Sequence, residues 1–84
     1  MTHPYEIGKS YFVRTVTMYT VGTLKSIYDG ELVFENASWV ADMGRFNEAL
    51  KTGNFQESER FERDAIVNRG AIVDATIWPH PLPK

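Results

Sequence analysis

Residues 66–78 read IVNRGAIVDATIW and place an Arg-Gly pair between two runs of alternating apolar residues. Alternation over roughly four to eight positions is typical of half-buried β-strands. Asn-Gly and Asp-Gly are the more common turns between two such strands, so the arginine needs an explanation. The stretch predicts a strand that ends near Val67, a tight corner at Arg69-Gly70, and a last strand over residues 71–78.

Residues 10–36 predict three strands, because SYFVRTVTMYTVGTLKSIYDGELVFEN is rich in Val, Thr, Tyr, Phe and Ile. Asp29-Gly30 is the best hairpin signal in the chain, since both residues tolerate the positive φ of a type I′ turn. The first turn is expected near Thr17 and Met18. No glycine or proline marks it.

After Asn36 the apolar residues follow the period of an α-helix. The stripe with spacing i, i+4, i+7, i+11 consists of Trp39, Met43, Phe46 and Leu50. It predicts an inserted helix over about residues 39–52, capped at its start by Ser38 or Asp42 and closed at its end by Gly53. We expect the stripe to lie in the core or in an interface, and we regard a cofactor box as a remote alternative.

The rest of the chain completes one domain. The stretch NFQESERFERD, residues 54–64, is interpreted as a polar connection into a fourth strand around Phe61 to Val67. We expect residues 1–10 to form a leader, 11–78 a single domain, and 79–84 (PHPLPK) a Pro-rich tail that cannot continue a central strand. The expected fold is mainly β, a small and strongly bent five-stranded barrel, partly closed, with one short inserted helix. Gly22 is the expected bend in the second strand.

Composition narrows the classes of function. Nine Lys and Arg against eleven Asp and Glu give a net charge of −2, so the overall field does not favour a polyanion. The chain contains no cysteine, so disulfides are excluded. Oligomerisation is then the commonest remaining way to add to the stability that a small hydrophobic core provides. No apolar stretch approaches the ~20 residues that span a bilayer, and no signal peptide is visible, so we expect a cytoplasmic protein without a membrane segment.

No residue pattern predicts catalysis, a cofactor or a metal site. His3 and His80 lie in the two terminal segments without acidic or cysteine partners at ligand spacing. The carboxylates of residues 57–64 alternate with Arg60 and Arg63, which indicates a solvated surface of mixed sign. The sequence has no nucleophile-base arrangement and no phosphate-cradling loop. We therefore expect no enzyme.

Two motifs resemble those of the Sm-like family. GTLKSIYDGELVFENA, residues 22–37, is similar to the first Sm motif, and IVNRGAIVDATIW is similar to the second. Together they cover less than half of the chain. The resemblance implies a bent five-stranded barrel that forms a homo-oligomeric ring of five to eight subunits, because Sm, Lsm and bacterial host-factor proteins pair the fourth strand of one protomer with the fifth of the next. Many of them bind single-stranded RNA around the pore.

The resemblance also implies a set of RNA-binding candidates, in which a base would stack between an aromatic ring and a guanidinium plane. These candidates are Tyr28, Asp29, Asn68, Arg69 and Gly70. Glu31 stands where RNA-binding members carry an asparagine, and its carboxylate would repel phosphate. A structural interpretation remains open: Tyr28 would cover the barrel rim, Gly70 would take a positive φ, and Arg69 would hydrogen-bond a neighbouring backbone or an acid across the interface.

The strands that would pair between subunits supply the interface candidates Ile66, Val67, Val73 and Ala75. Two functions are consistent with such an oligomer. The first is binding of single-stranded RNA or a nucleotide at the pore face. The second is a structural or adaptor role, in which the inserted helix, with Arg45, and the WPHPLPK tail recruit a protein partner without nucleic acid.

Overall fold

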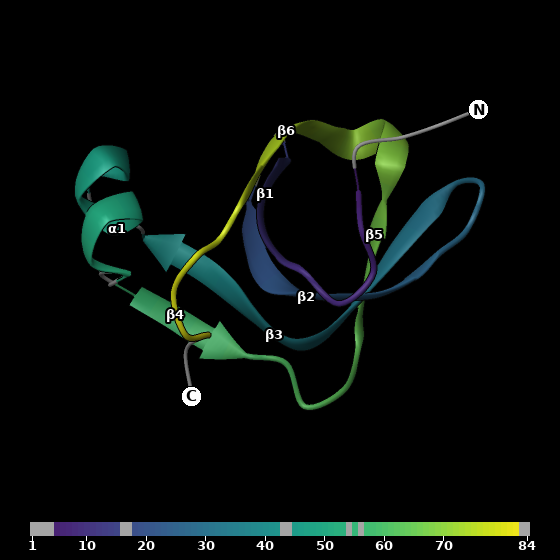
Figure 1. Ribbon diagram of the computed structural model, residues 1–84, viewed down its shortest axis with the longest axis horizontal. Helices are drawn as coiled ribbons and strands as arrows, with labels where there is room; N and C mark the ends of the chain where they lie inside the picture. Colours follow the sequence, from purple (N-terminus) through teal and green to yellow (C-terminus); the bar gives the residue numbers. More distant parts are fainter. Residues whose placement is uncertain (1–4, 16–17, 43–44, 54, 56, 83–84) are drawn as a thin grey trace.

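The computed structural model describes residues 5–15, 18–42, 45–53, 55 and 57–82. These residues form one antiparallel sheet of six strands and one short α-helix (Figure 1). The elements in chain order are β1 (Ser10–Thr15), β2 (Tyr19–Ile27), β3 (Glu31–Asp42), α1 (Phe46–Thr52), β4 (Glu57–Arg60), β5 (Ala65–Asn68), the 3-10 turn η1 (Arg69–Ala71) and β6 (Ile72–Ile77). The expectation of a mainly β fold with one short helix is confirmed.

The long strand β3 organises the sheet. Its first part, Glu31 to Phe34, pairs with β5, and its last part, Ser38 to Asp42, pairs with β4. The strand order is β4-β3-β2-β1-β6, with β5 beside β3. Figure 1 shows the sheet curling around a central space, with α1 outside the curl. No ladder joins β6 to β4 or β5 in the described residues, so the sheet is not closed into a barrel.

Two strands replace the single fourth strand that the sequence predicts. Residues 61–64, expected to begin that strand, form the loop between β4 and β5, and β4 lies inside the stretch interpreted as a polar connection. The exposed side chains of Ser58, Glu59 and Arg60 give no apolar alternation. Their backbone nevertheless pairs with β3, and charged side chains are common on edge strands because they discourage aggregation. The expected count of five strands is therefore wrong.

Gly22 lies where β2 must bend, as the sequence predicts. A Cβ atom on Gly22 would approach the Cβ atom of Ala37 to 2.9 Å, so only glycine fits without a shift of the backbone. The β2–β3 register shifts between Val21 and Thr23, and Asn36 on β3 has a φ of 50°. Such a bulge increases local twist and lets a sheet curl.

Both expected hairpin turns are present. The backbone N–H of Tyr28 donates to the carbonyl of Glu31 across the β2–β3 turn, at 2.8 Å. Neither Asp29 nor Gly30 has a positive φ, so the predicted type I′ conformation is wrong. The turn between β1 and β2 lies where expected, with the N–H of Thr15 donating to the carbonyl of Met18; residue 17 lies outside the described residues.

The helix begins later than its apolar stripe predicts. Trp39 belongs to β3, where it pairs with Thr20 on one side and Glu59 on the other. These two non-local ladders override the local helical period. The N-cap position is occupied by Arg45, without a side-chain hydrogen bond, whereas the predicted capping residues Ser38 and Asp42 both belong to β3, so that prediction is wrong. Met43 lies outside the described residues.

The end of the helix is as predicted. Gly53 has a φ of 77°, and its N–H donates to the carbonyl of Ala49. A left-handed residue at this position is the common way to end a helix, and glycine adopts it without steric cost.

Side chains on the two faces of the curled sheet form two cores. On the concave face, Leu24, Leu32 and Phe34 are almost fully buried. On the convex face, Phe12, Val21, Val40, Ala49 and Trp78 pack together under α1 and the C-terminal segment. No helix in the described part of the chain is long and apolar enough to cross a membrane.

Candidate functional site

Three strands of the described residues, β4, β5 and β6, each leave one edge open, and the edges of β5 and β6 carry exposed aliphatic side chains. Within the described residues β5 pairs only with β3, and β6 pairs only with β1. The four interface candidates lie on these strands. Ile66 is 70% exposed and Val73 is 56% exposed, whereas Val67 and Ala75 are half-buried and pack against the concave core. The open edges of β5 and β6 therefore each combine one apolar residue packed against the core with one that faces water.

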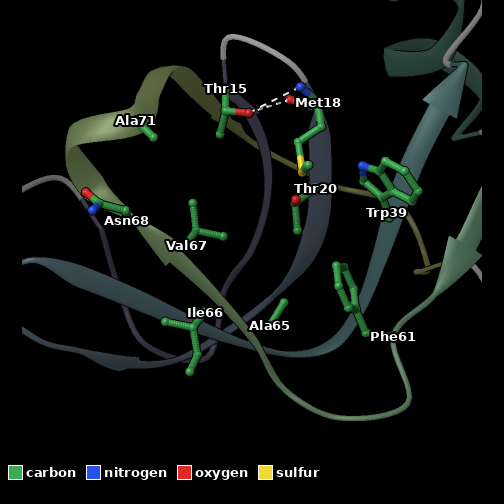
Figure 2. A pocket seen from close by; sticks show the side chains of 10 residues that line it. All are labelled: Thr15, Met18, Thr20, Trp39, Phe61, Ala65, Ile66, Val67, Asn68 and Ala71. Atoms are coloured by element: carbon green, nitrogen blue, oxygen red, sulfur yellow. Dashed lines mark hydrogen bonds between the residues drawn. The ribbon is translucent and has the colours of Figure 1, made fainter.

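An apolar hollow of about 550 Å³ borders the edge of β5. All four residues of β5 line it, together with Met18, Trp39 and Phe61 (Figure 2). Figure 2 shows the ring of Phe61 directed toward Trp39, at the opposite end of the hollow from Asn68. Trp39 remains 40% exposed because no described segment covers it. Pockets of this size that carry aromatic side chains are typical binding sites.

Two interactions hold the β4–β5 loop beside this hollow. The backbone N–H of Phe61 donates to the carbonyl of Ala37 at 2.9 Å. Nζ of Lys25 contacts Oδ2 of Asp64 at 2.7 Å. The hydrogen bond and the charge of Asp64 raise the pKa of Lys25 above its ordinary value of 10.5. The loop is thereby tied to β2 and β3.

The corner between β5 and β6 lies against the β2–β3 hairpin. Nη2 of Arg69 donates to the carbonyl oxygen of Tyr28 at 3.0 Å, and the backbone N–H of Arg69 donates to that of Gly30 at 2.9 Å. Oδ1 of Asn68 accepts from the N–H of Gly70 at 2.8 Å and so caps the 3-10 turn. Gly70 has no positive φ, contrary to the structural interpretation of this pair.

The structure thus brings the RNA-binding candidates together at this corner. The side chain of Tyr28 is exposed, and Arg69 is half-buried beside it. Asp29 follows Tyr28 in the exposed turn, and Glu31 is the cross-strand partner of Asn68. One guanidinium, already hydrogen-bonded to a carbonyl, therefore shares the corner with two carboxylates. Its electrostatics do not resemble those of a phosphate-binding surface.

The sequence pattern does not reveal the aromatic hollow. The sequence predicts Trp39 on a helix, Phe61 at the start of a strand and Met18 in a turn. These side chains lie close together because β3 pairs with β4. The charged sequence of β4 does not predict a strand, so this pairing could not be expected. In the folded protein, the exposed indole ring of Trp39 marks the position of the hollow.

No group of three or more His, Asp or Glu side chains in the described ranges is placed to hold a metal ion. No protein-family model matches the sequence, and no curated protein or solved structure is significantly similar to it.

Proposed function

We propose that the protein is a self-associating β-module in which β5 of one copy pairs with β6 of the next. The observation that carries this proposal is the pair of open edges, one bordering the apolar hollow and the other presenting Val73 and Ile77, which are both more than half exposed. Strand addition would satisfy the unpaired backbone groups of both edges.

The side chains on these edges support association. Natural edge strands usually carry charges, prolines or bulges that prevent pairing with another chain. β4 follows this rule, with exposed Glu59 and Arg60. β5 and β6 present Ile66 and Val73 instead. Burying an aliphatic side chain of this size contributes about 1.5–3 kcal/mol, which favours a stable contact between copies.

Pairing two different edges makes the contact heterologous. An open assembly then always leaves one unused β5 edge at one end and one unused β6 edge at the other, so it either closes into a ring or continues as a filament. A closed ring of five to eight copies is what the Sm-like resemblance implies, and we propose this form. The helix α1 and the C-terminal segment lie away from β5 (Figure 1), on the face that a ring would offer to a protein partner.

Light scattering coupled to size exclusion tests self-association. The monomer mass is 9.6 kDa, and we expect a well-defined multiple of it. Ile66→Lys and Val73→Lys should each yield monomers, because the new charge would have to be buried without a partner. Ile7→Lys is the matched control, since Ile7 is 63% exposed and lies on neither edge. A monomeric wild-type protein at micromolar concentration would refute the proposal.

The second candidate function is binding of single-stranded RNA or a nucleotide. The specific observation in its favour is the hydrogen bond from the Arg69 guanidinium to the backbone carbonyl of Tyr28, whose side chain is exposed; a ring would repeat this pair of residues around its centre. Fluorescence anisotropy with oligo-U and oligo-A at low salt tests it. If the wild-type protein binds RNA and Tyr28→Ala does not, RNA recognition at this corner is supported. If the wild-type oligomer does not bind RNA, the structural or adaptor role is favoured.

A further inference from the structure

A second hollow, of about 360 Å³, lies on the convex face between the sheet and the C-terminal segment. Its floor consists of side chains from β1, β2, β3 and β4, namely Ser10, Thr23, Asn36 and Arg60, and residues 80–82 form its wall. The first hollow is mainly apolar, whereas this one gathers a guanidinium, two hydroxyls, a carboxamide and an imidazole. It therefore suits a ligand of different chemistry.

Arg60 supplies the positive charge. Its Nη2 donates to Oδ1 of Asn36 at 2.9 Å, which orients the guanidinium. Arg60 forms no ion pair with any described carboxylate, whereas Arg14 is paired with Asp74 and Lys25 with Asp64. Its charge is therefore not neutralised within the described part of the chain, and the other N–H groups of its planar fork are suited to an oxyanion.

The floor also carries a hydroxyl pair. Oγ of Ser10 and Oγ1 of Thr23 lie 3.0 Å apart, and either can be the donor. One hydroxyl hydrogen makes this bond, and the other hydroxyl hydrogen can point toward a ligand. The two residues are cross-strand partners on β1 and β2, so the position of this donor is fixed by the sheet.

The wall is held in place by packing. The backbone N–H of Trp78 donates to the carbonyl of Ser10 at 2.8 Å, and its ring stacks on Phe55 with centroids 4.8 Å apart. The ring of His80 lies against Trp78 and Gly53, where a Cβ on Gly53 would come within 2.6 Å of Cγ of His80. The hollow is thus bounded by a C-terminal segment that is docked on the sheet.

We propose that this hollow binds an oxyanion, either inorganic phosphate or the phosphoryl group of a small organic molecule. The guanidinium of Arg60 and the hydroxyl pair supply charge-assisted and neutral hydrogen bonds to its oxygens. Leu82 in the wall adds apolar contact for an organic substituent. The net charge of −2 opposes diffuse attraction of anions, so affinity must arise from this local arrangement.

NMR titration of the full-length protein tests the proposal. Inorganic phosphate and phenyl phosphate are added at constant ionic strength, and the amide shifts of Ser10, Thr23 and Asn36 are followed. Saturable shifts are expected. Arg60→Ala should weaken binding about tenfold or more, and Arg60→Lys should retain only part of it, because an ammonium keeps the charge but lacks the planar fork. Arg63→Ala is the matched control, because Arg63 is exposed in the neighbouring loop and does not line the hollow.

The affinities of the two probes distinguish a site for free phosphate from a site for organic phosphates. Tighter binding of phenyl phosphate than of phosphate assigns the site to organic phosphates, and equal binding assigns it to the free anion. Absence of saturable shifts with both probes overturns the proposal. An equal loss of affinity in Arg60→Ala and Arg63→Ala also overturns it, because diffuse charge would then explain the binding.

Discussion

Arg69 and Tyr28, 41 positions apart in sequence, are joined by a 3.0 Å hydrogen bond from the guanidinium Nη2 to the carbonyl oxygen. This bond fastens the corner between β5 and β6 to the β2–β3 hairpin. It explains why an arginine precedes Gly70 where a simple hairpin would carry Asn or Asp. The side chain reaches the neighbouring hairpin, which a shorter residue could not do.

Replacement of this arginine should loosen the corner. We expect Arg69→Ala to lower the free energy of unfolding by about 1–2 kcal/mol, because a hydrogen bond from a charged donor to a carbonyl is lost. Urea denaturation followed by circular dichroism measures the change. Arg63→Ala is the control, since Arg63 is exposed in the β4–β5 loop. Equal stability of the two variants would show that the contact with Tyr28 contributes nothing.

The bend of β2 gives a second prediction. Gly22→Ala should destabilise the protein by about 1–3 kcal/mol, because the new methyl would lie 2.9 Å from the Cβ atom of Ala37 and force the strands apart. Gly30→Ala is the control, since nothing lies within 4 Å of its added Cβ. Thermal denaturation of both variants checks this. Unchanged stability in Gly22→Ala would contradict the close approach of β2 and β3.

The structural features that the sequence predicts correctly depend on residues that are close together along the chain. The Asp29-Gly30 hairpin and the alternation of residues 71–78 both correspond to observed features, as does the bend at Gly22. The φ values of the turns were not predictable in the same way. Asp29 and Gly30 tolerate positive φ, but tolerance does not require a residue to adopt it, and the hairpin forms without it.

The failures concern residues whose conformation is decided by distant partners. Trp39 fits a helical stripe, yet its backbone is paired with Thr20 and Glu59 in a three-stranded arrangement. The charged residues of β4 carry no strand signal, because an edge strand is held mainly by backbone pairing. The hollow between Trp39 and Phe61 exists only after that pairing forms, so no sequence pattern could indicate it.

The ion pair of Lys25 with Asp64 predicts a pH dependence. The pKa of Lys25 is raised above 10.5 in the folded protein, so the stabilisation is fully present below pH 10.5 and is lost as the pH rises through the folded pKa. In Asp64→Asn the pKa of Lys25 should return toward 10.5. Nitrogen-detected NMR of the Lys25 side chain measures both values. Identical pKa values in the two proteins would mean that the pair does not form in solution.

The RNA hypothesis makes a gain-of-binding prediction at Glu31. If RNA approaches the Tyr28–Arg69 corner, Glu31→Gln should tighten oligo-U binding roughly threefold to fivefold, because one repulsive carboxylate is removed near the phosphates. Glu62→Gln, on the β4–β5 loop, removes the same charge elsewhere and is the control. Fluorescence anisotropy compares them. Equal effects of the two changes would indicate that net charge, and not this corner, governs any binding.

Cysteine crosslinking tests the pairing of β5 with β6 most directly, since the natural chain contains no cysteine. Ile66→Cys protein is mixed under mild oxidation with protein carrying cysteine at Val73, Asp74, Ala75, Thr76 or Ile77, which scans both faces of β6. Paired strands bring Cα atoms within the ~4.4–6.8 Å that a disulfide requires. We predict that one mixture forms a heterodimer far faster than either protein crosslinks with itself. Crosslinking no faster than that of an Ile7→Cys control in every mixture would contradict the account.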